Sequence, residues 1–469
     1  MKSKKAIGAA AFALVGIIIM MFRPFEASGL VPIGNSVLGL VFIMLGLWIF
    51  RPNNVPYTTG AMVLTAGGMI AGVQLGILTS GFVSSGLWIL IPALYFGFAL
   101  AKTGLGKRIA YMVLKIFKPS YASMILAWFI IGIILSILTP SITVRVAIVM
   151  PIAISCIEAC KLEDRSRGAA LICLVAWAMA VLPGTGWLTG SLWGPIFVGF
   201  FPKELSDLTN WGSYFQIMAL PWLLTTVFFT VAVYFLLKPK ESMAISKETF
   251  EEAYEKLGKI SKNEIIVGVI LIGSFLLFAT ESIHKIPTAA TAMAAFFCML
   301  LFSIISFQEI GTGVSWDIII FFGLAFSLPK IFGTAMVAKW MSTLIGPVIF
   351  GMAGNALVFI IGFTVLLFII RLVDVPWGLT TLALTVPLLV PLYNNYGIHP
   401  VVVAVAFAAA GNCFFMSYHQ PFLMLGEAVS QGRGWAPKHV SIAGLAYAAS
   451  IITAMLVSFP YWRSIGAMP

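Results

Sequence analysis

The stretch Leu138-Thr139-Pro140-Ser141-Ile142-Thr143-Val144-Arg145 interrupts a long apolar region with a polar, proline-containing segment. It separates the apolar runs 121–137 and 146–156, which are short for helices that cross a bilayer, since a crossing takes about 20 residues. Two short apolar arms joined by a polar tip predict a re-entrant hairpin over residues 121–157. Such a break at membrane depth is tolerated only where protein or a water-filled cavity covers the backbone.

The whole chain has the composition of a polytopic membrane protein. Hydrophobic residues make up 60% of the 469 residues, charged residues make up 10%, and the mean hydropathy is +1.03. Ordinary soluble domains do not have this composition. The net charge of +11 does not indicate nucleic-acid binding, because the basic residues lie in short loops between apolar runs, as topology determinants do. The five cysteines lie in or beside apolar runs and have no metal-binding spacing.

Helix-breaking residues interrupt two predicted membrane segments. Residues 167–202 and 399–430 are each too long for one straight crossing. The first contains Leu182-Pro183-Gly184-Thr185-Gly186-Trp187, and the second is interrupted between Asn412 and Pro421. Transporters use such broken helices to aim half-helix dipoles at a binding site. The other predicted spans are 6–22, 35–50, 58–78, 86–101, 213–237, 264–282, 287–306, 315–330 and 440–459, with a second hairpin at 353–393.

Basic residues predict the orientation of the chain. If both hairpins return to the side from which they came, most of the 28 Lys and Arg residues lie on the same side as the N-terminus. We expect the protein to lie in the inner (plasma) membrane of the cell. The positive-inside rule then places the N-terminus in the cytoplasm and the C-terminus on the outer side of this membrane. A cleaved signal peptide is the less favoured alternative for residues 2–22, because no clear small-residue cleavage site follows them.

The chain divides at a long polar segment, 238–263, which we expect to be a cytoplasmic linker with a short surface helix at 247–257. A basic amphipathic stretch at 103–118 predicts a helix in the membrane interface. Residues 1–237 and 264–469 each contain spans, a hairpin, a broken helix and a last span, in that order. Their predicted orientations are opposite. The sequence therefore predicts an all-α polytopic membrane protein with two inverted repeats, re-entrant hairpins and broken transmembrane helices, as in secondary transporters.

Arg145 lies one helical turn past the first tip. A buried cation is costly in a membrane protein and suggests a functional role. Its guanidinium could hold a carboxylate or sulfate by two parallel hydrogen bonds. Alternatively, it pairs with a helix C-terminus or an acidic neighbour. Ser141, Thr143 and Thr185 could donate hydroxyl hydrogen bonds to the same anion, although Ser and Thr also cap helices.

The second half of the chain also contains candidates for substrate contacts and for proton coupling. Arg371 and Asp374 are three residues apart and would share a helix face as a buried ion pair, or Asp374 could carry a coupling proton. His419, in the second helix break, could contact the substrate or a proton, or be a structural histidine of the core. Thr380 and Thr381 complete the predicted substrate contacts.

Taken together, the motifs resemble the divalent anion–sodium symporter (DASS) family, part of a wider ion transporter superfamily. Pro140-Ser141-Ile142-Thr143, followed by Met150-Pro151-Ile152, is similar to the family's first Ser-Asn-Thr hairpin motif. Residues 184–191 (GTGWLTGS) are similar to its Gly-Thr-Gly-rich helix break, and residues 316–323 (WDIIIFFG) to the Trp-led helix of its second transport unit. The resemblance covers nearly the whole chain in element order. It implies an elevator-type transporter that works as a homodimer in the lipid bilayer.

Two departures from the family pattern concern sodium. Ile142 stands where the family has Asn, and Trp377-Gly378-Leu379 stands where a second Ser-Asn-Thr would lie. Sodium needs several oxygen ligands. The resemblance therefore implies a weakened first cation site at Ser141, Ile142 and Gly184, and a second site at Gly378 that lacks its side-chain oxygens. Na⁺ or H⁺ is the expected coupling ion, and no other cofactor is expected.

The predicted function is secondary active transport of a small divalent anion, which is a dicarboxylate, tricarboxylate, sulfonate or sulfate, with reduced or absent sodium coupling. The alternative is a cation–proton antiporter or oxyanion permease that uses Asp374 for proton coupling. An enzyme is not expected. The sequence contains no nucleophile elbow or His/Cys/Asp cluster, and Gly184-Thr185-Gly186 lacks the lysine of a phosphate-binding loop.

Overall fold

The computed structural model describes residues 2–117, 120–239, 248–371 and 378–469. Within these ranges the regular structure is helical throughout and contains no strand. Ten of the described helices are long and apolar enough to cross a membrane by length and composition. The prediction of an all-α polytopic membrane protein is therefore confirmed.

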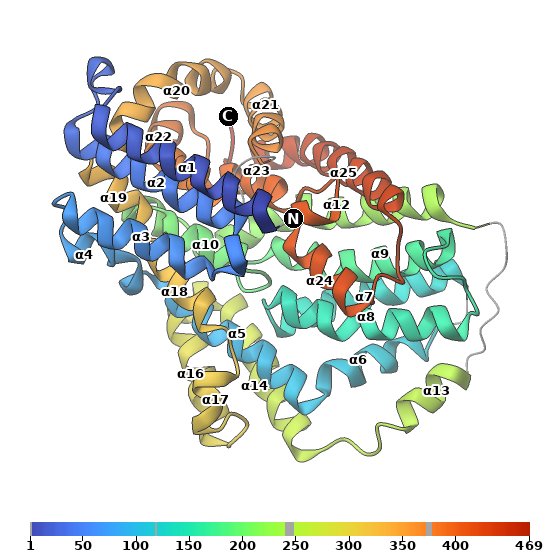
Figure 1. Ribbon diagram of the computed structural model, residues 1–469. Helices are drawn as coiled ribbons and strands as arrows, with labels where there is room; N and C mark the ends of the chain where they lie inside the picture. Colours follow the sequence, from blue (N-terminus) through green and yellow to red (C-terminus); the bar gives the residue numbers. More distant parts are fainter. Residues whose placement is uncertain (1, 118–119, 240–247, 372–377) are drawn as a thin grey trace.

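The N-terminal helices form a layer at one side of the molecule, drawn in blue in Figure 1. α1 and α2 lie close together because glycines face each other: a Cβ atom on Gly16 would lie 2.3 Å from the Gly39 carbonyl oxygen. The layer consists of α1 (Lys2–Phe22), α2 (Pro32–Phe50), α3 (Tyr57–Ile70) and α4 (Leu75–Leu78), with 3₁₀ turns η1 (Glu26–Ser28), η2 (Pro52–Asn54) and η3 (Ser80–Val83). α5 (Ser85–Thr103) and α6 (Leu105–Leu114) follow and lead the chain away from this layer.

The single span predicted at 58–78 is wrong. α3 ends at Ile70, and α4 begins only at Leu75. Between them Gly72 has a φ of +90°, a left-handed conformation that ends a helix and that glycine adopts without strain. The apolar composition continued through this turn, so it did not reveal the break.

The first hairpin consists of α7 (Tyr121–Leu138) and α8 (Ile142–Ala159). Each arm has 18 residues, so the prediction of arms too short to cross is wrong. α8 begins four residues before the apolar run, because Ser141 caps it by accepting a hydrogen bond from the Val144 amide. The non-helical tip is only Thr139–Ser141.

The next helix covers this hairpin. α9 (Arg167–Val181) packs against both α7 and α8, and all of its residues from Gly168 to Val181 are buried. A helix that is apolar all round belongs in the core. α9 ends at the turn η4 (Pro183–Gly186), and the chain resumes helical structure in α10 (Trp193–Phe200), α11 (Lys203–Ser206) and α12 (Trp211–Leu237). The interruption lies where the sequence predicts it.

The second part of the chain contains a second interrupted helix, α23 (Pro400–Asn412), η5 (Ser417–His419) and α24 (Pro421–Val429). The arms of the predicted second hairpin are the helices α21 (Ala356–Ile370) and α22 (Leu379–Tyr396), and its predicted tip lies outside the described residues. The remaining helices are α13 (Glu248–Glu255), α14 (Lys262–Ala279), α15 (Glu281–His284), α16 (Thr288–Leu301), α17 (Phe307–Thr312), α18 (Trp316–Ala325), α19 (Leu328–Thr334), α20 (Val337–Ala353) and α25 (Pro437–Ser464).

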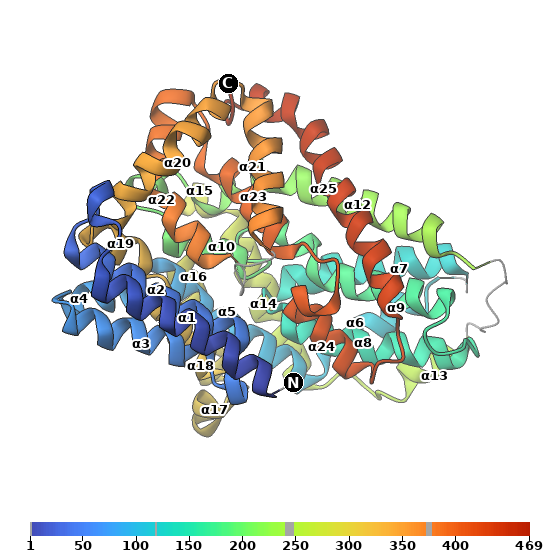
Figure 2. The ribbon, with the colours of Figure 1, turned by 45° about the horizontal axis from the view of Figure 1, so that its top comes forward.

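The two parts meet in the middle of the molecule. α12 and α25 contact each other and run side by side in both views (Figures 1 and 2). They have 27 and 28 residues and are the last long helices of their respective parts. α10 also contacts α22, and α12 contacts α23, so the helix breaks of the two parts lie near each other.

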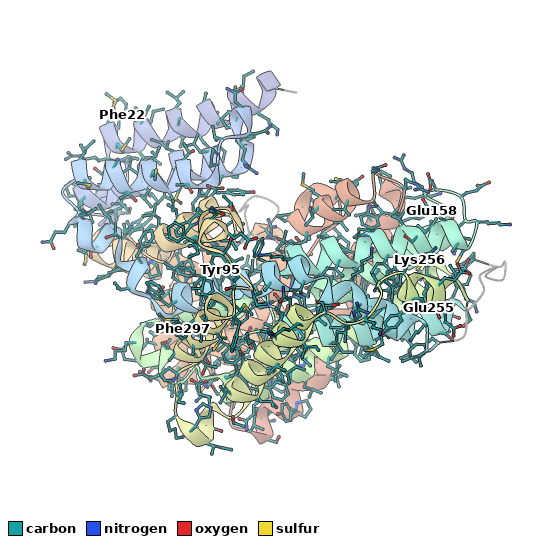
Figure 3. All side chains as sticks on the ribbon, turned by 90° about the horizontal axis from the view of Figure 1, so that it is seen from below. Phe22, Tyr95, Glu158, Glu255, Lys256 and Phe297 are labelled. Carbon is teal, nitrogen blue, oxygen red and sulfur yellow. The ribbon has the colours of Figure 1, made fainter. Side chains whose placement is uncertain are left out.

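Charged side chains gather at one end of the molecule, where α8 ends and α13 lies. Figure 3 shows Glu158, Glu255 and Lys256 at this end, whereas Tyr95 lies in the interior. At this end α6, the amphipathic helix predicted at 103–118, is joined to the chain between α13 and α14. The Arg108 guanidinium donates to Glu264 at 2.6 Å and to the carbonyl oxygens of residues 257–259, and both side chains are buried.

We predict that Glu264→Gln lowers the free energy of unfolding by about 3 kcal/mol, because it leaves the buried Arg108 guanidinium without its counter-charge. Glu158→Gln is the matched control. Glu158 pairs with Arg433 at 2.6 Å but is 56% exposed, so its loss is expected to cost less than about 1 kcal/mol. Thermal unfolding of both purified variants in detergent measures the difference. Equal destabilisation by the two substitutions would contradict the assignment.

Candidate functional site

Arg145 lies in the first turn of α8 with its side chain in the protein core. The side chain is 0% exposed, and its Nε, Nη1 and Nη2 atoms have no hydrogen-bond partner among the described residues. None of the ion pairs within the described ranges includes it. An ionised group without a partner is very costly to bury. Within the described ranges, Arg145 is a buried cationic side chain without a counter-charge.

The first helix break lies directly against this guanidinium. A Cβ atom built on Gly184 would lie 2.5 Å from Arg145 Nη1 and 2.0 Å from the Gly190 carbonyl oxygen. Only glycine fits at position 184 without displacing these groups. The break is held in place by Trp187, whose Nε1 donates to the Ser136 carbonyl oxygen of α7 at 3.0 Å, so the tip and the break form one packed unit.

The second helix break contributes a buried amide to the same region. Asn412 ends α23, and its Nδ2 donates to Thr185 Oγ1 at 3.5 Å. Its Oδ1 accepts from Trp193 Nε1 at 3.3 Å and from Gln420 Nε2 at 3.5 Å. Asn412, Thr185 and Gln420 are each no more than 1% exposed. The bonds of Asn412 to Thr185 and Trp193 join the two halves of the chain across more than two hundred residues in sequence.

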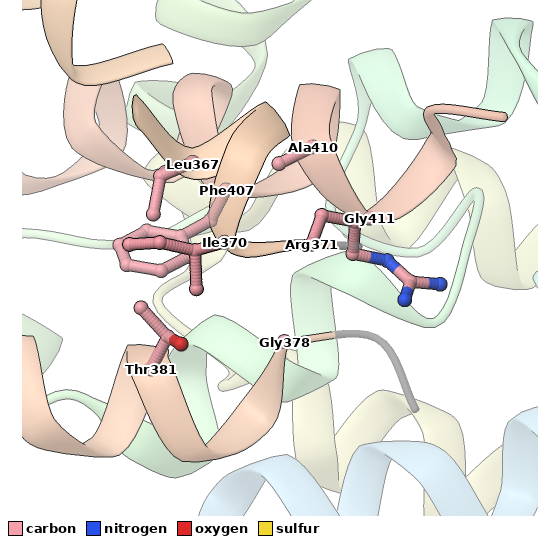
Figure 4. A pocket seen from close by; sticks show the side chains of 8 residues that line it. All are labelled: Leu367, Ile370, Arg371, Gly378, Thr381, Phe407, Ala410 and Gly411. Carbon is pink, nitrogen blue, oxygen red and sulfur yellow. The ribbon is translucent and has the colours of Figure 1, made fainter. Parts of the chain in front are cut away.

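A small cavity of about 10 Å³, with room for about one water molecule, lies beside Gly411 and at the second hairpin tip. Figure 4 shows Arg371, Gly378 and Thr381 at its wall, with the guanidinium pointing away from the apolar residues. Arg371 is 5% exposed, and its Nη2 donates to the His419 carbonyl oxygen at 2.7 Å. A second buried cation thus lies at the second tip.

The structure brings most of the predicted residues into one continuous series of contacts. Ser141, Arg145, Gly184 and Thr185 form its first part. Arg371, Gly378, Thr381 and His419 form its second part, and Gly411 and Asn412 of α23 connect the two.

Four of the predicted site residues are not part of this series of contacts. Thr143 is exposed, because its side chain lies about 200° around the axis of α8 from the buried Arg145 side chain. Ile142 is buried and supplies no side-chain oxygen, and Thr380 is buried with an Oγ1 that has no partner among the described residues. Asp374 lies outside the described residues, as does its predicted pairing with Arg371.

Sequence reasoning did not select Asn412 and Gln420, which are at the centre of the site. The signal was present, because both are polar residues at the ends of an interrupted apolar helix. His419 attracted the prediction instead, because a histidine can titrate near neutral pH. In the structure its Nδ1 accepts a hydrogen bond from the Phe415 amide at 3.3 Å, a local contact within the break.

The side chains around the two breaks include two buried guanidinium groups, hydroxyl groups and amide N–H groups, which are of the kinds that donate hydrogen bonds to carboxylate or sulfate oxygens. Among the residues that the structure describes, no group of three or more His, Cys, Asp or Glu side chains could hold a metal ion.

The sequence matches a known protein family over nearly its whole length. The model of a family described as the sodium:sulfate symporter transmembrane region matches residues 4–466. The chain belongs to this family. The resemblance noted in the hairpin and break motifs is thereby confirmed, and this family member is a multi-pass membrane transporter.

Individual relatives of this family member are distant. A protein named membrane protein from Cupriavidus necator is 24% identical, over 97% of this chain and 92% of its own length. The sodium-dependent dicarboxylate transporter SdcS of Staphylococcus saprophyticus is 21% identical over 81% of this chain and 82% of its own. The chloroplastic dicarboxylate transporter 1 of Spinacia oleracea is 23% identical over 63% of this chain, which covers 54% of that protein.

A solved structure supports the fold. The Alcanivorax borkumensis YdaH transporter, whose topology is described as unusual, matches 86% of this chain and 91% of its own with a TM-score of 0.56. The two sequences are 13% identical, so this likeness concerns the fold alone.

We predict that Gly184→Ala destabilises the transporter by about 1–3 kcal/mol, because the new methyl group overlaps the Gly190 carbonyl and the Arg145 guanidinium. Gly273→Ala on α14 is the control, since a Cβ atom there meets nothing within 4 Å. Thermal unfolding followed by tryptophan fluorescence compares the two. A Gly184→Ala protein as stable as the control would show that the break relaxes freely around the guanidinium.

Proposed function

We propose that this protein is a secondary active transporter of small divalent anions, with a dicarboxylate as the first candidate and a tricarboxylate, sulfonate or sulfate as the others. The observation that carries the proposal is the buried Arg145 guanidinium, which has no counter-charge among the described residues and lies at the junction of a hairpin tip and a helix break. A bound anion would supply the missing counter-charge and accept its N–H groups.

The second half of the chain also brings a buried arginine to the helix breaks. Arg371, at the end of α21, donates from its Nη2 to the His419 carbonyl oxygen in the second break. The names of the relatives from Staphylococcus saprophyticus and Spinacia oleracea support a dicarboxylate within this class.

We further propose an elevator motion, in which the hairpins and broken helices move as a unit against the remaining helices. The matching order of the two parts supports an inverted-repeat plan: a hairpin, an interrupted helix and a long last helix occur in each. A homodimer in the inner membrane, with the N-terminus in the cytoplasm and the C-terminus outside, completes the proposal. It rests on the family and on the positive-inside rule.

The test is uptake into proteoliposomes made with the purified protein. Labelled succinate, citrate, sulfate and a small sulfonate are offered with and without the same anion inside, in Na⁺ or choline, and with and without a pH gradient. Anion-dependent uptake that exceeds empty liposomes supports the proposal, and failure of every anion under every condition refutes it. Uptake that requires the pH gradient would indicate proton coupling.

We predict that Arg145→Lys raises the KM for the transported anion about tenfold, because an ammonium group cannot reproduce the two parallel hydrogen bonds of a guanidinium. Arg463→Lys, at the exposed end of α25, is the matched control and is expected to leave the KM unchanged. Initial rates of uptake over a range of substrate concentrations give both values. A wild-type KM in the Arg145→Lys protein would remove Arg145 from the substrate site.

A further inference from the structure

We infer that the groove between α8 and the helices α5 and α6 binds an anionic phospholipid of the surrounding membrane. The Lys107 ammonium group contacts the lipid phosphate, and the apolar walls hold part of an acyl chain. None of the residues that line this groove belongs to either helix break, so the inference concerns a second binding site. It follows from the shape of the groove, from the charge at its edge and from the amphipathic helix that forms one wall.

The groove is a cavity of about 320 Å³ beside the second arm of the first hairpin. Ligand pockets in proteins have volumes of about 300–1,000 Å³. α8 lines the cavity with Ala147, Pro151 and Ser155, which are spaced by four residues, share one face of the helix and are exposed. These short side chains leave room beside α8. On the facing wall, a Cβ atom on Gly104 at the end of α5 would meet nothing within 4 Å.

The walls are apolar except for three side chains, those of Lys107, Tyr111 and Ser155. Lys107 and Tyr111 lie one turn apart on α6, and the Lys107 Nζ is 5.9 Å from the centre of the Tyr111 ring. A small soluble anion needs many hydrogen-bond donors to replace its water, and apolar walls do not supply them. A phospholipid needs a cation and a few hydroxyl groups for its phosphate and apolar surface for its chain, which is what this groove offers.

Lys107 provides the charge that selects an anionic headgroup. It is exposed, and no ion pair within the described ranges includes it. The neighbouring basic residues already have acidic partners. Lys102 pairs with Glu309 at 2.6 Å. Arg108 pairs with Glu264 at 2.6 Å. The ammonium group of Lys107 therefore remains for a ligand from outside the chain.

The position of Lys107 on α6 favours a membrane lipid as that ligand. α6 is amphipathic and contacts α8, beside which it lies in both views (Figures 1 and 2). Most of its side chains are buried, and the exposed ones are those of Lys107 and Met112. Basic amphipathic helices lie at the level of the lipid headgroups, and basic pockets between membrane helices bind anionic headgroups there. A lipid in the groove would contact both α6 and the hairpin arm that carries Arg145.

The second hairpin has a cavity in a comparable place, which differs in charge. This cavity has a volume of about 280 Å³ and lies between α20 and the arms α21 and α22. Its polar lining side chains are those of Thr381 and Thr385, and none of the described residues that line it is charged. A cavity beside a hairpin is thus common to both halves, whereas a lining cation belongs to the first. Of these two cavities, only the groove of Lys107 is expected to select an anionic headgroup.

The experiment measures lipid retention by the purified full-length protein in detergent, using native mass spectrometry. Dioleoylphosphatidylglycerol and dioleoylphosphatidylcholine are added at equal concentrations, because they have the same acyl chains and differ in headgroup charge. The wild type is expected to retain about fivefold more phosphatidylglycerol than phosphatidylcholine, and Lys107→Gln is expected to remove this preference. Lys256→Gln is the matched control. It removes an exposed charge at the same end of the molecule (Figure 3), outside the groove, and is expected to retain lipid like the wild type.

Two further measurements test the place and the source of the ligand. Ala147→Phe fills the groove without changing its charge and is expected to lower phosphatidylglycerol retention to the level of Lys107→Gln. Glycerol 3-phosphate carries the phosphate without acyl chains, and an excess of it is expected not to displace the lipid.

Equal retention of the two lipids by the wild type would overturn the inference, as would equal phosphatidylglycerol retention by Lys107→Gln and Lys256→Gln. Wild-type retention by a folded Ala147→Phe protein would place the lipid elsewhere and overturn it as well. Displacement by glycerol 3-phosphate would overturn the assignment to a membrane lipid. If Ala147→Phe does not fold, the two lysine variants decide. None of these measurements requires transport, so their outcome is independent of the proposed function.

Discussion

A buried arginine that has no hydrogen-bond partner among the described residues constrains the packing around it. The Arg145 guanidinium is enclosed by protein at the tip on which it lies, and it packs against Gly184 in the turn that follows α9. α9 provides that enclosure with a surface that is buried on all sides, and glycine at position 184 provides the room. The hairpin, the break and the arginine therefore depend on one another.

The same constraint explains why the two helix breaks meet. An interrupted helix leaves backbone groups that lipid cannot satisfy. Here polar side chains of the two breaks also bond to each other: Asn412 Nδ2 donates to Thr185 Oγ1, and Trp193 Nε1 donates to Asn412 Oδ1. The region of the two breaks is therefore shared between the two halves of the chain. A movement of one half relative to the other would have to break these bonds.

The ion pairs near the end of α8 and near α13 join helices to each other. The Arg108–Glu264 pair joins the amphipathic helix α6 to the start of α14, and Arg433 bridges Glu158 and Asp164 of the first half. These ion pairs hold elements together, whereas no ion pair within the described ranges includes Arg145.

The sequence by itself determined the helical membrane class, the family, the two interruptions and the tip with Arg145, because apolar runs, prolines and glycines act locally along the chain. Prediction from the sequence placed the start of α8 four residues too late and missed the turn after α3. Composition alone does not reveal a helix cap or a glycine with a left-handed backbone conformation. Only the tertiary structure decided that Asn412 and Gln420 belong to the site, that Thr143 faces outward, and that Arg145 lies against Gly184. Those are relations between segments far apart in sequence, and they exist only when packing brings the segments together.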